Sequence, residues 1–195
     1  HLFLLNLIKN NDDLALILKP KKESLLKEIL GDQYIIYEEL INSERCYIFE
    51  DGLSNTPGAA ASASDVIINS SIYGASAGVE SILCETPTVF IDRDNLDKSI
   101  LYKSNSSEFI YNSIEQAWEA IEKNMINSET DNFGSWNDII DLLDPFRDGN
   151  AMKRVCNYLS RINQELKAGL NRDKALYLIA EEYKDKWGQD KIINP

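Results

Sequence analysis

The sequence of 195 residues is poor in the side chains that most often carry metal and acid–base chemistry. Histidine occurs once, at position 1, so a Ser-His-Asp triad or a histidine metal cluster has no candidate members. The three cysteines, Cys46, Cys84 and Cys156, lie far apart in apolar stretches and form no CxxC pair. These absences predict a protein without a metal site or cofactor, whose cysteines are buried, reduced thiols.

Long apolar runs and an excess of basic residues are also missing. No run approaches the 18 or so residues of a membrane-spanning helix, and no signal-like segment opens the chain. The formal net charge of -12 repels phosphate backbones and anionic lipids. We therefore expect a cytoplasmic protein with no transmembrane segment and no nucleic-acid partner. Lys19 and Lys22 belong to the one tight basic cluster before Arg147, which makes them candidates for binding a small anion.

The chain alternates strand-like and helix-like segments in the manner of a parallel α/β sheet. Apolar runs predict strands at 13–20, 33–39, 46–51, 65–70, 87–92 and 108–112. Helical spacing and capping signals predict helices at 2–11, 22–32, 57–64, 75–85, 113–125, within 136–146, and at 151–169 and 172–188. We expect an α/β fold with a Rossmann-like parallel sheet, helices on both of its faces, and C-terminal helices after it.

Two domains follow from this pattern, a Rossmann-like domain over 1–147 and a helical extension over 148–195. A doubly wound domain normally begins with its central strand, whereas this chain begins with a predicted helix. We therefore expect that the first strand is missing and that the chain is a fragment.

A run of small residues, Gly74 to Gly78, follows the strand at 65–70 and forms the start of the next predicted helix. One interpretation is a ligand site at the carboxyl end of a parallel strand, where a helix N-terminus offers unpaired N–H groups. Ser71 and Ser76 would add hydroxyl groups, and Glu80 could accept hydrogen bonds from the vicinal hydroxyls of a sugar. The other interpretation is structural, because small residues also let a helix pack closely on a sheet.

The run ASDVIINSSIYGASAGVESILCETPTVFID resembles the donor-binding segment of GT-B glycosyltransferases and of the related UDP-N-acetylglucosamine 2-epimerases. In these families a glutamate lies seven residues before a proline that opens the next strand, as Glu80 and Pro87 do here. Glu85 stands where such families usually have glycine. The stretches LILKPK, LLDPFRDGNAMKRV and ALYLIAEEYKDKWGQDKI are similar to segments of GT-B enzymes, the last two to those that build bacterial surface polysaccharides.

The resemblance implies the donor-binding half of a glycosyltransferase that uses a nucleotide sugar in surface-carbohydrate biosynthesis. It implies no cofactor, and it implies a missing N-terminal half that binds the acceptor and supplies the catalytic base, so the fragment alone should be inactive. A nucleotide-sugar 2-epimerase and a non-catalytic α/β binding module remain the alternatives. The donor-binding residues implied by the resemblance are Glu80 for the ribose, Ser76, Ala77 and Gly78 for the diphosphate, Gly74 and Ser71 in the preceding loop, and Lys19 or Lys22 for phosphate charge.

Arg147 lies between two acids in the stretch DPFRDG. It could contact a donor phosphate, or it could be held by Asp144 and Asp148 as a structural clamp. Asp148 is expected to be the N-cap of the helix that follows.

Overall fold

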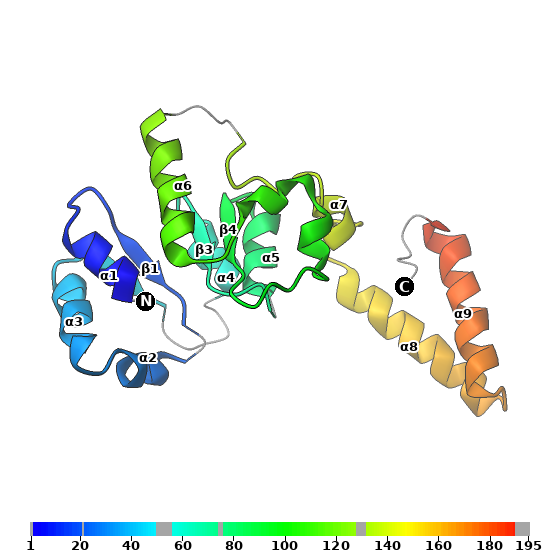
Figure 1. Ribbon diagram of the computed structural model, residues 1–195. Helices are drawn as coiled ribbons and strands as arrows, with labels where there is room; N and C mark the ends of the chain where they lie inside the picture. The colour runs from blue at the N-terminus through cyan, green and yellow to red at the C-terminus, as the bar shows by residue number, and fades with distance from the viewer. Residues whose placement is uncertain (1, 21, 50–55, 74–75, 128–131, 190–195) are drawn as a thin grey trace. The chain divides into compact units, whose positions relative to one another are not determined.

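The computed structural model describes residues 2–20, 22–49, 56–73, 76–127 and 132–189 (Figure 1). The chain divides into two compact units, His1–Ile140 and Asp141–Pro195. The first unit holds two small parallel sheets with helices around them, and the second is helical. The α/β class predicted from the sequence is confirmed. The expected domain boundary fell seven residues later, after residue 147.

The first sheet has two parallel strands, β1 (Leu16–Leu18) and β2 (Cys46–Ile48), with Leu16 opposite Cys46. The helices that connect and flank these strands are α1 (Leu2–Lys9), α2 (Glu23–Leu30), the 3-10 turn η1 (Gly31–Gln33) and α3 (Tyr34–Asn42). Alternate strand residues and the apolar stripes of the helices share one core. Its buried members are Leu5, Ile8, Leu18, Leu26, Leu30, Tyr37, Leu40 and Cys46.

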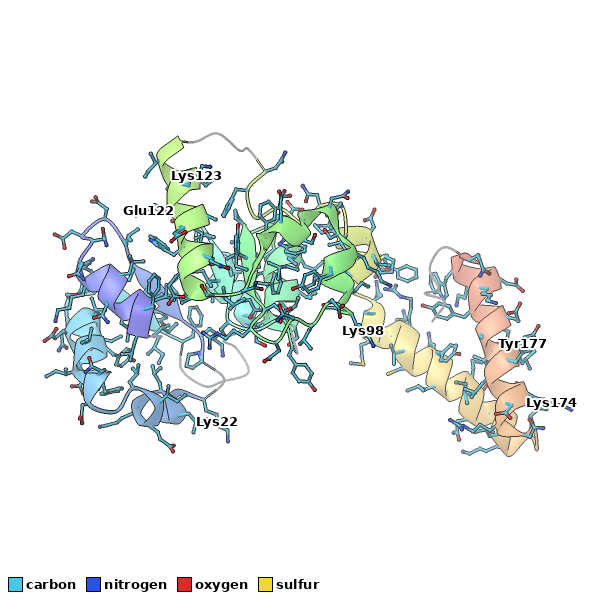
Figure 2. All side chains as sticks on the ribbon, viewed as in Figure 1. Lys22, Lys98, Glu122, Lys123, Lys174 and Tyr177 are labelled. Carbon is cyan, nitrogen blue, oxygen red and sulfur yellow. The ribbon has the colours of Figure 1, made fainter. Side chains whose placement is uncertain are left out.

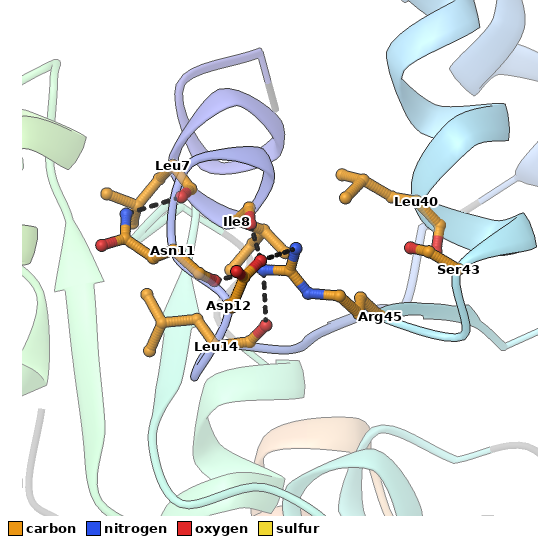
Figure 3. Close-up of polar contacts among 8 residues, drawn as sticks. All are labelled: Leu7, Ile8, Asn11, Asp12, Leu14, Leu40, Ser43 and Arg45. Atoms are coloured by element: carbon orange, nitrogen blue, oxygen red, sulfur yellow. Dashed lines mark hydrogen bonds and ion pairs between the residues drawn. The ribbon is translucent and has the colours of Figure 1, made fainter.

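Arg45, directly before β2, ties the end of α1 to the first sheet (Figure 3). Its guanidinium donates hydrogen bonds to the carbonyl oxygens of Ile8, Asn11 and Leu14, and it pairs with Asp12 at 3.1 Å. The last carbonyls of a helix lack intrahelical donors, so this arginine satisfies groups that would otherwise need water.

The second sheet has three parallel strands in the order β3 (Ile67–Asn69), β4 (Thr88–Ile91) and β5 (Ile110–Tyr111). The central strand β4 is buried along its whole length. On one face Val89 and Ile91 share a core with α6 (Ile114–Asn127). On the other face Phe90 lies against α5 (Ser76–Leu83). This sheet therefore carries helices on both faces, as expected for an α/β fold.

A loop with two 3-10 turns, η2 (Ile100–Lys103) and η3 (Asn105–Phe109), joins β4 to β5. Asp92, buried immediately after β4, organises this loop by accepting hydrogen bonds from Leu96 N at 2.7 Å and from the Tyr102 hydroxyl at 2.6 Å. Burial and the bond to Asp92 raise the pKa of Tyr102 to about 12. The loop is thus fixed at the carboxyl end of the sheet's central strand.

The short helix α7 (Ile140–Leu143) leads into the second unit, which consists mainly of α8 (Ala151–Lys167) and α9 (Arg172–Trp187). The two long helices pack as a hairpin. Arg161 bridges them by pairing with Glu182 at 2.8 Å, and the Tyr158 and Tyr183 rings meet edge to face. Within the described part of the chain, no helix has the length and apolar character needed to cross a bilayer.

Three sequence-based expectations were wrong. Residues 33–39 were predicted as a strand but belong to η1 and α3, where Tyr37 and Leu40 are buried at helical spacing. The cysteines were expected to be buried, but only Cys46 is, and burial raises its pKa to about 11; Cys84 and Cys156 are exposed. Asp148 is not a helix N-cap, because α8 begins at Ala151 and Asn150 occupies the N-cap position.

Candidate functional site

The candidate site lies where β3 ends and α5 begins. The first N–H groups of a helix have no intrahelical partner and carry a partial positive charge, which favours an anion at this place. Ser76 is the first residue of α5 and is exposed, and Ala77 follows it. Gly74 lies outside the described residues. The structure thus places the predicted diphosphate-binding residues Ser76, Ala77 and Gly78 in the first turn of one helix.

Gly78 faces the sheet and is buried. A Cβ at this position would lie 2.3 Å from Phe90 Cε1 and 2.5 Å from Asn69 Nδ2, so a larger residue fits only if these side chains or α5 shift. The absent side chain therefore serves the close packing of α5 on β3 and β4. Of the two interpretations of the small-residue run, packing accounts for this glycine, while its backbone N–H still belongs to the first turn of the helix.

Glu80 lies on the side of α5 that faces α4 (Pro57–Ala61) and is half-buried. Its Oε2 accepts a hydrogen bond from Gly58 N, in the first turn of α4, at 3.3 Å. The other carboxylate oxygen, Oε1, has no hydrogen-bond partner among the described residues. Glu80 is thus held through Oε2, and an ionised carboxylate has more acceptor sites than this one hydrogen bond uses.

The helices α4 and α5 run side by side in the same direction. The start of α4 meets Glu80, and the end of α4 meets the residues that follow α5, because the Thr86 hydroxyl donates to Ala61 O at 3.1 Å. Thr56 caps α4 by accepting from Ala59 N at 3.2 Å, and Pro57 occupies its first turn. Both helix N-termini therefore point toward the same end of the second sheet, the end where β3 finishes.

The loop between β3 and α5 is organised by local hydrogen bonds. Asn69 Nδ2 donates to Ser71 O at 3.1 Å, and the Ser71 hydroxyl accepts from Tyr73 N at 3.1 Å. Ser71 and Tyr73 are both exposed, and 79% of Tyr73 is accessible. The Ser71 hydroxyl therefore stabilises the loop conformation. Ser71 is exposed and lies five residues before the first residue of α5.

The predicted basic residues lie in other parts of the chain. Lys19 and Lys22 follow β1 in the first sheet, and Lys22 occupies the N-cap position of α2 (Figure 2). No hydrogen bond or ion pair among the described residues joins them to α5. Arg147 belongs to the second unit, where its backbone N donates to Asp144 Oδ1 at 3.0 Å and its φ of 45° is left-handed.

Arg154, which was not singled out in the sequence, is the central charged residue of the second unit. It is buried, and its Nη1 donates to both carboxylate oxygens of Asp148, at 2.8 and 3.0 Å. Its guanidinium also stacks 3.7 Å from the Phe146 ring centroid, and the Trp187 ring lies 5.7 Å away. The hydrogen bonds from Arg154 lower the pKa of Asp148 to about 2. Asp148 and Arg154 therefore form a structural clamp between DPFRDG and α8.

The second sheet also carries a cavity away from the start of α5. It measures about 590 Å³ and is bordered by Phe109, Tyr111, Lys123, Phe133 and Asp138. These residues come from the segments before and within β5 and from the second half of α6, so the cavity lies toward the amino end of β5. Ligands of parallel sheets bind outside the carboxyl ends of the strands, which favours the start of α5 as the functional site.

Asp138, at the border of this cavity, fixes the neighbouring loop. It accepts hydrogen bonds from Ser104 Oγ at 2.8 Å and from Asn105 N at 2.7 Å. Partial desolvation opposes its ionisation, but these bonds outweigh that effect and lower the pKa of Asp138. Its carboxylate is therefore committed to loop structure. The described residues include no cluster of three or more metal-ligating side chains.

Comparisons with known proteins identify no relative of this chain. No family model matches it, and no curated protein or solved structure is significantly similar to it. A functional assignment therefore depends on the residues and geometry of the chain itself.

Proposed function

We propose that this chain is the donor-binding half of a GT-B-like glycosyltransferase that transfers a sugar from a nucleotide sugar in surface-carbohydrate biosynthesis. The nucleoside diphosphate binds at the start of α5, where the N–H groups of Ser76, Ala77 and Gly78 meet its phosphates. Glu80 accepts hydrogen bonds from the ribose hydroxyls. A separate acceptor-binding half supplies the catalytic base.

The position of Glu80 is the observation that carries this proposal. A carboxylate anchored through one oxygen to Gly58 N is oriented without being fully occupied, and its Oε1 can accept from both hydroxyls of a vicinal diol. The N-termini of α4 and α5 lie at the same end of the sheet and favour the negative charge of a diphosphate. N–H groups aimed at a leaving diphosphate stabilise the charge that develops on it without an obligatory metal ion.

A nucleotide-binding measurement tests the proposal, and Glu80→Gln is the informative variant. Gln retains an oxygen that can accept from Gly58 N, so the packing of α4 on α5 is preserved while the charge is lost. Losing a charged hydrogen-bond acceptor should weaken binding of a nucleoside diphosphate by about 1–3 kcal/mol in calorimetry. Several nucleoside diphosphates should be compared, because the base is not specified by Glu80.

Glu85→Gln is the matched control, because Glu85 lies past the end of α5 and is exposed. It should leave the affinity unchanged. Equal binding by the parent and both variants would show that Glu80 serves packing alone. Lack of binding by the parent would instead favour a non-catalytic α/β binding module, a function that the exposed apolar residues of the last two helices also support.

A further inference from the structure

The cavity toward the amino end of β5 lies apart from the proposed nucleotide site. Its volume of about 590 Å³ falls within the range of about 300–1,000 Å³ that is typical of small-molecule sites. Its walls come from η3 and β5, from the second half of α6, and from the segment 132–138. All of these segments belong to the first unit, so the cavity does not depend on the second unit.

Three half-buried aromatic side chains, Phe109, Tyr111 and Phe133, form the apolar wall of the cavity. All three also pack against the core that contains Val89 and Ile91, and this core holds them in position. The Phe109 and Phe133 rings lie at 66° to each other, with their centroids 5.3 Å apart. These two rings therefore form an angled wall and not a parallel pair between which a flat ligand could stack.

Several polar groups at the border of this cavity are available to a ligand. The side-chain amides of Asn105, Asn132 and Asn137 make no hydrogen bond within the described part of the chain. The same holds for the Tyr111 hydroxyl. Each amide offers donors and an acceptor side by side, and a phenol can donate and accept. Burial and the nearby Glu108 carboxylate raise the pKa of Tyr111, so its hydroxyl keeps its proton at neutral pH.

The charged groups at the border do not favour a charged ligand. Lys123, on the second half of α6 (Figure 2), and Glu108 carry opposite charges. Asp138 is occupied by the hydrogen bonds that it accepts from the hydroxyl groups of Ser104 and Ser106. An anion would meet two carboxylates and only one ammonium group, so the cavity suits a neutral ligand.

We propose that this cavity binds a neutral saccharide. The C–H face of a sugar ring packs on aromatic side chains, and its vicinal hydroxyl groups match the donors and acceptors of side-chain amides. A puckered sugar ring fits the angled wall of Phe109 and Phe133 better than a flat nucleobase does. A purely apolar ligand would deprive the amides of water without replacing its hydrogen bonds, which is costly. The cavity is separate from the start of α5, and this inference does not depend on the nucleotide proposal.

Titration of the isotope-labelled whole chain with neutral saccharides, followed by amide correlation NMR, tests the proposal. Maltotriose, cellotriose and N,N′-diacetylchitobiose are the probes, and adenosine is the flat neutral comparison. At least one saccharide should shift the amide signals of residues 105–111 and 132–138 together. Asn137→Ala should weaken its binding about two- to tenfold, as expected for the loss of one neutral hydrogen bond. Tyr111→Phe should have a similar effect, because it removes the hydroxyl and keeps the ring.

Asn112→Ala is the matched control, because this exposed asparagine lies past the carboxyl end of β5 and does not border the cavity. It should leave the saccharide affinity unchanged, and so should Glu80→Gln. The amide spectra of the variants also check that the fold is retained. Failure of the parent to bind any of the three saccharides overturns the proposal. So does binding that Asn137→Ala and Tyr111→Phe both leave unchanged, binding of adenosine in place of the saccharides, or loss of saccharide binding in Glu80→Gln.

Discussion

At the scale of single residues, Gly78 determines how closely α5 approaches the second sheet. Gly78→Ala would place a methyl group 2.3 Å from Phe90 Cε1, a separation that requires α5 or the buried Phe90 ring to move. Overpacking of this kind should lower the free energy of unfolding by about 1–3 kcal/mol. Chemical denaturation followed by circular dichroism measures the change.

Gly58→Ala is the control for this substitution because Gly58 also lies in a helix of the same unit. Its Cβ would come 3.2 Å from Cys84 Sγ, a contact that small shifts can relieve. The gain in helix propensity, about 1 kcal/mol, should offset much of that cost. Equal destabilisation by both substitutions would contradict a special packing role for Gly78.

Asp148 makes the stability of the second unit dependent on pH. Its pKa in the folded chain is about 2, compared with an ordinary value of 3.8, because Arg154 donates hydrogen bonds to its ionised form. A carboxyl whose pKa is lowered by folding contributes its full stabilisation above about pH 4, and the contribution is lost as the pH falls through about 2. The thermal midpoint of this unit should therefore fall over that interval.

Asp148→Asn tests this dependence. The variant should have a lower thermal midpoint than the parent at neutral pH, and the difference should shrink as the pH approaches 2. Asp185→Asn, at an exposed position near the end of α9, should leave the midpoint close to that of the parent. A constant difference between parent and Asp148→Asn at every pH would show that the carboxylate charge does not act through Arg154.

At the scale of secondary-structure elements, Trp136 fastens the loop after α6 to the first residue of β4. Its ring N–H donates to Thr88 O at 2.8 Å, and Thr88 N donates to Gly134 O at 2.8 Å. The Trp136 ring also meets Phe90 edge to face at 5.2 Å. Gly134 has a φ of 67°, and a Cβ there would lie 2.8 Å from Thr88 N, so this loop requires glycine.

Trp136→Phe should destabilise the first unit by about 1–3 kcal/mol, because a buried carbonyl loses its donor. Urea denaturation checks this value. Trp118→Phe, in the half-buried part of α6, should cost less because that ring does not bond to Thr88. A larger effect at Trp118 would mean that ring packing, and not the hydrogen bond to β4, dominates at these positions.

The strands were more predictable than their pairing. Each of β1 to β5 lies within a segment that the sequence predicted as a strand, because β-branched and aromatic residues gather there. Among the described residues, however, β1 pairs only with β2, and β3 begins a separate sheet. The segment 33–39 was predicted wrongly because its apolar residues come in pairs, which fit the two-residue period of a strand as well as the 3.6-residue period of a helix. In the structure it is helical, and Tyr37 and Leu40 are buried on one face of α3.

The candidate site was predictable only in part. The position of Ser76 to Gly78 at a helix start follows from the local sequence, but the contact of Glu80 with Gly58 spans 22 residues and has no local signal. Arg154 was not predicted as a key residue because part of its environment comes from a distant part of the sequence. Phe146 and Asp148 lie nearby in the DPFRDG stretch, but Trp187 is the last residue of α9.

At the scale of the whole molecule, the chain consists of two units whose stabilising contacts differ. The first unit depends on strand pairing and the two apolar cores. The second depends on the α8–α9 hairpin and its charged clamp. Two substitutions, one in each unit, that share no contact should therefore change the free energy of unfolding additively.

The placement of two tryptophans allows the unfolding of each unit to be recorded separately by fluorescence. Trp136 is buried in the first unit, with 2% of its surface accessible, so its emission should be blue-shifted and should move to longer wavelength when that unit opens. Trp187 lies beside the Arg154 guanidinium in the second unit and should report the opening of the helical hairpin. Replacing Trp118 and one of these two residues by Phe would leave a single indole as the optical signal of one unit.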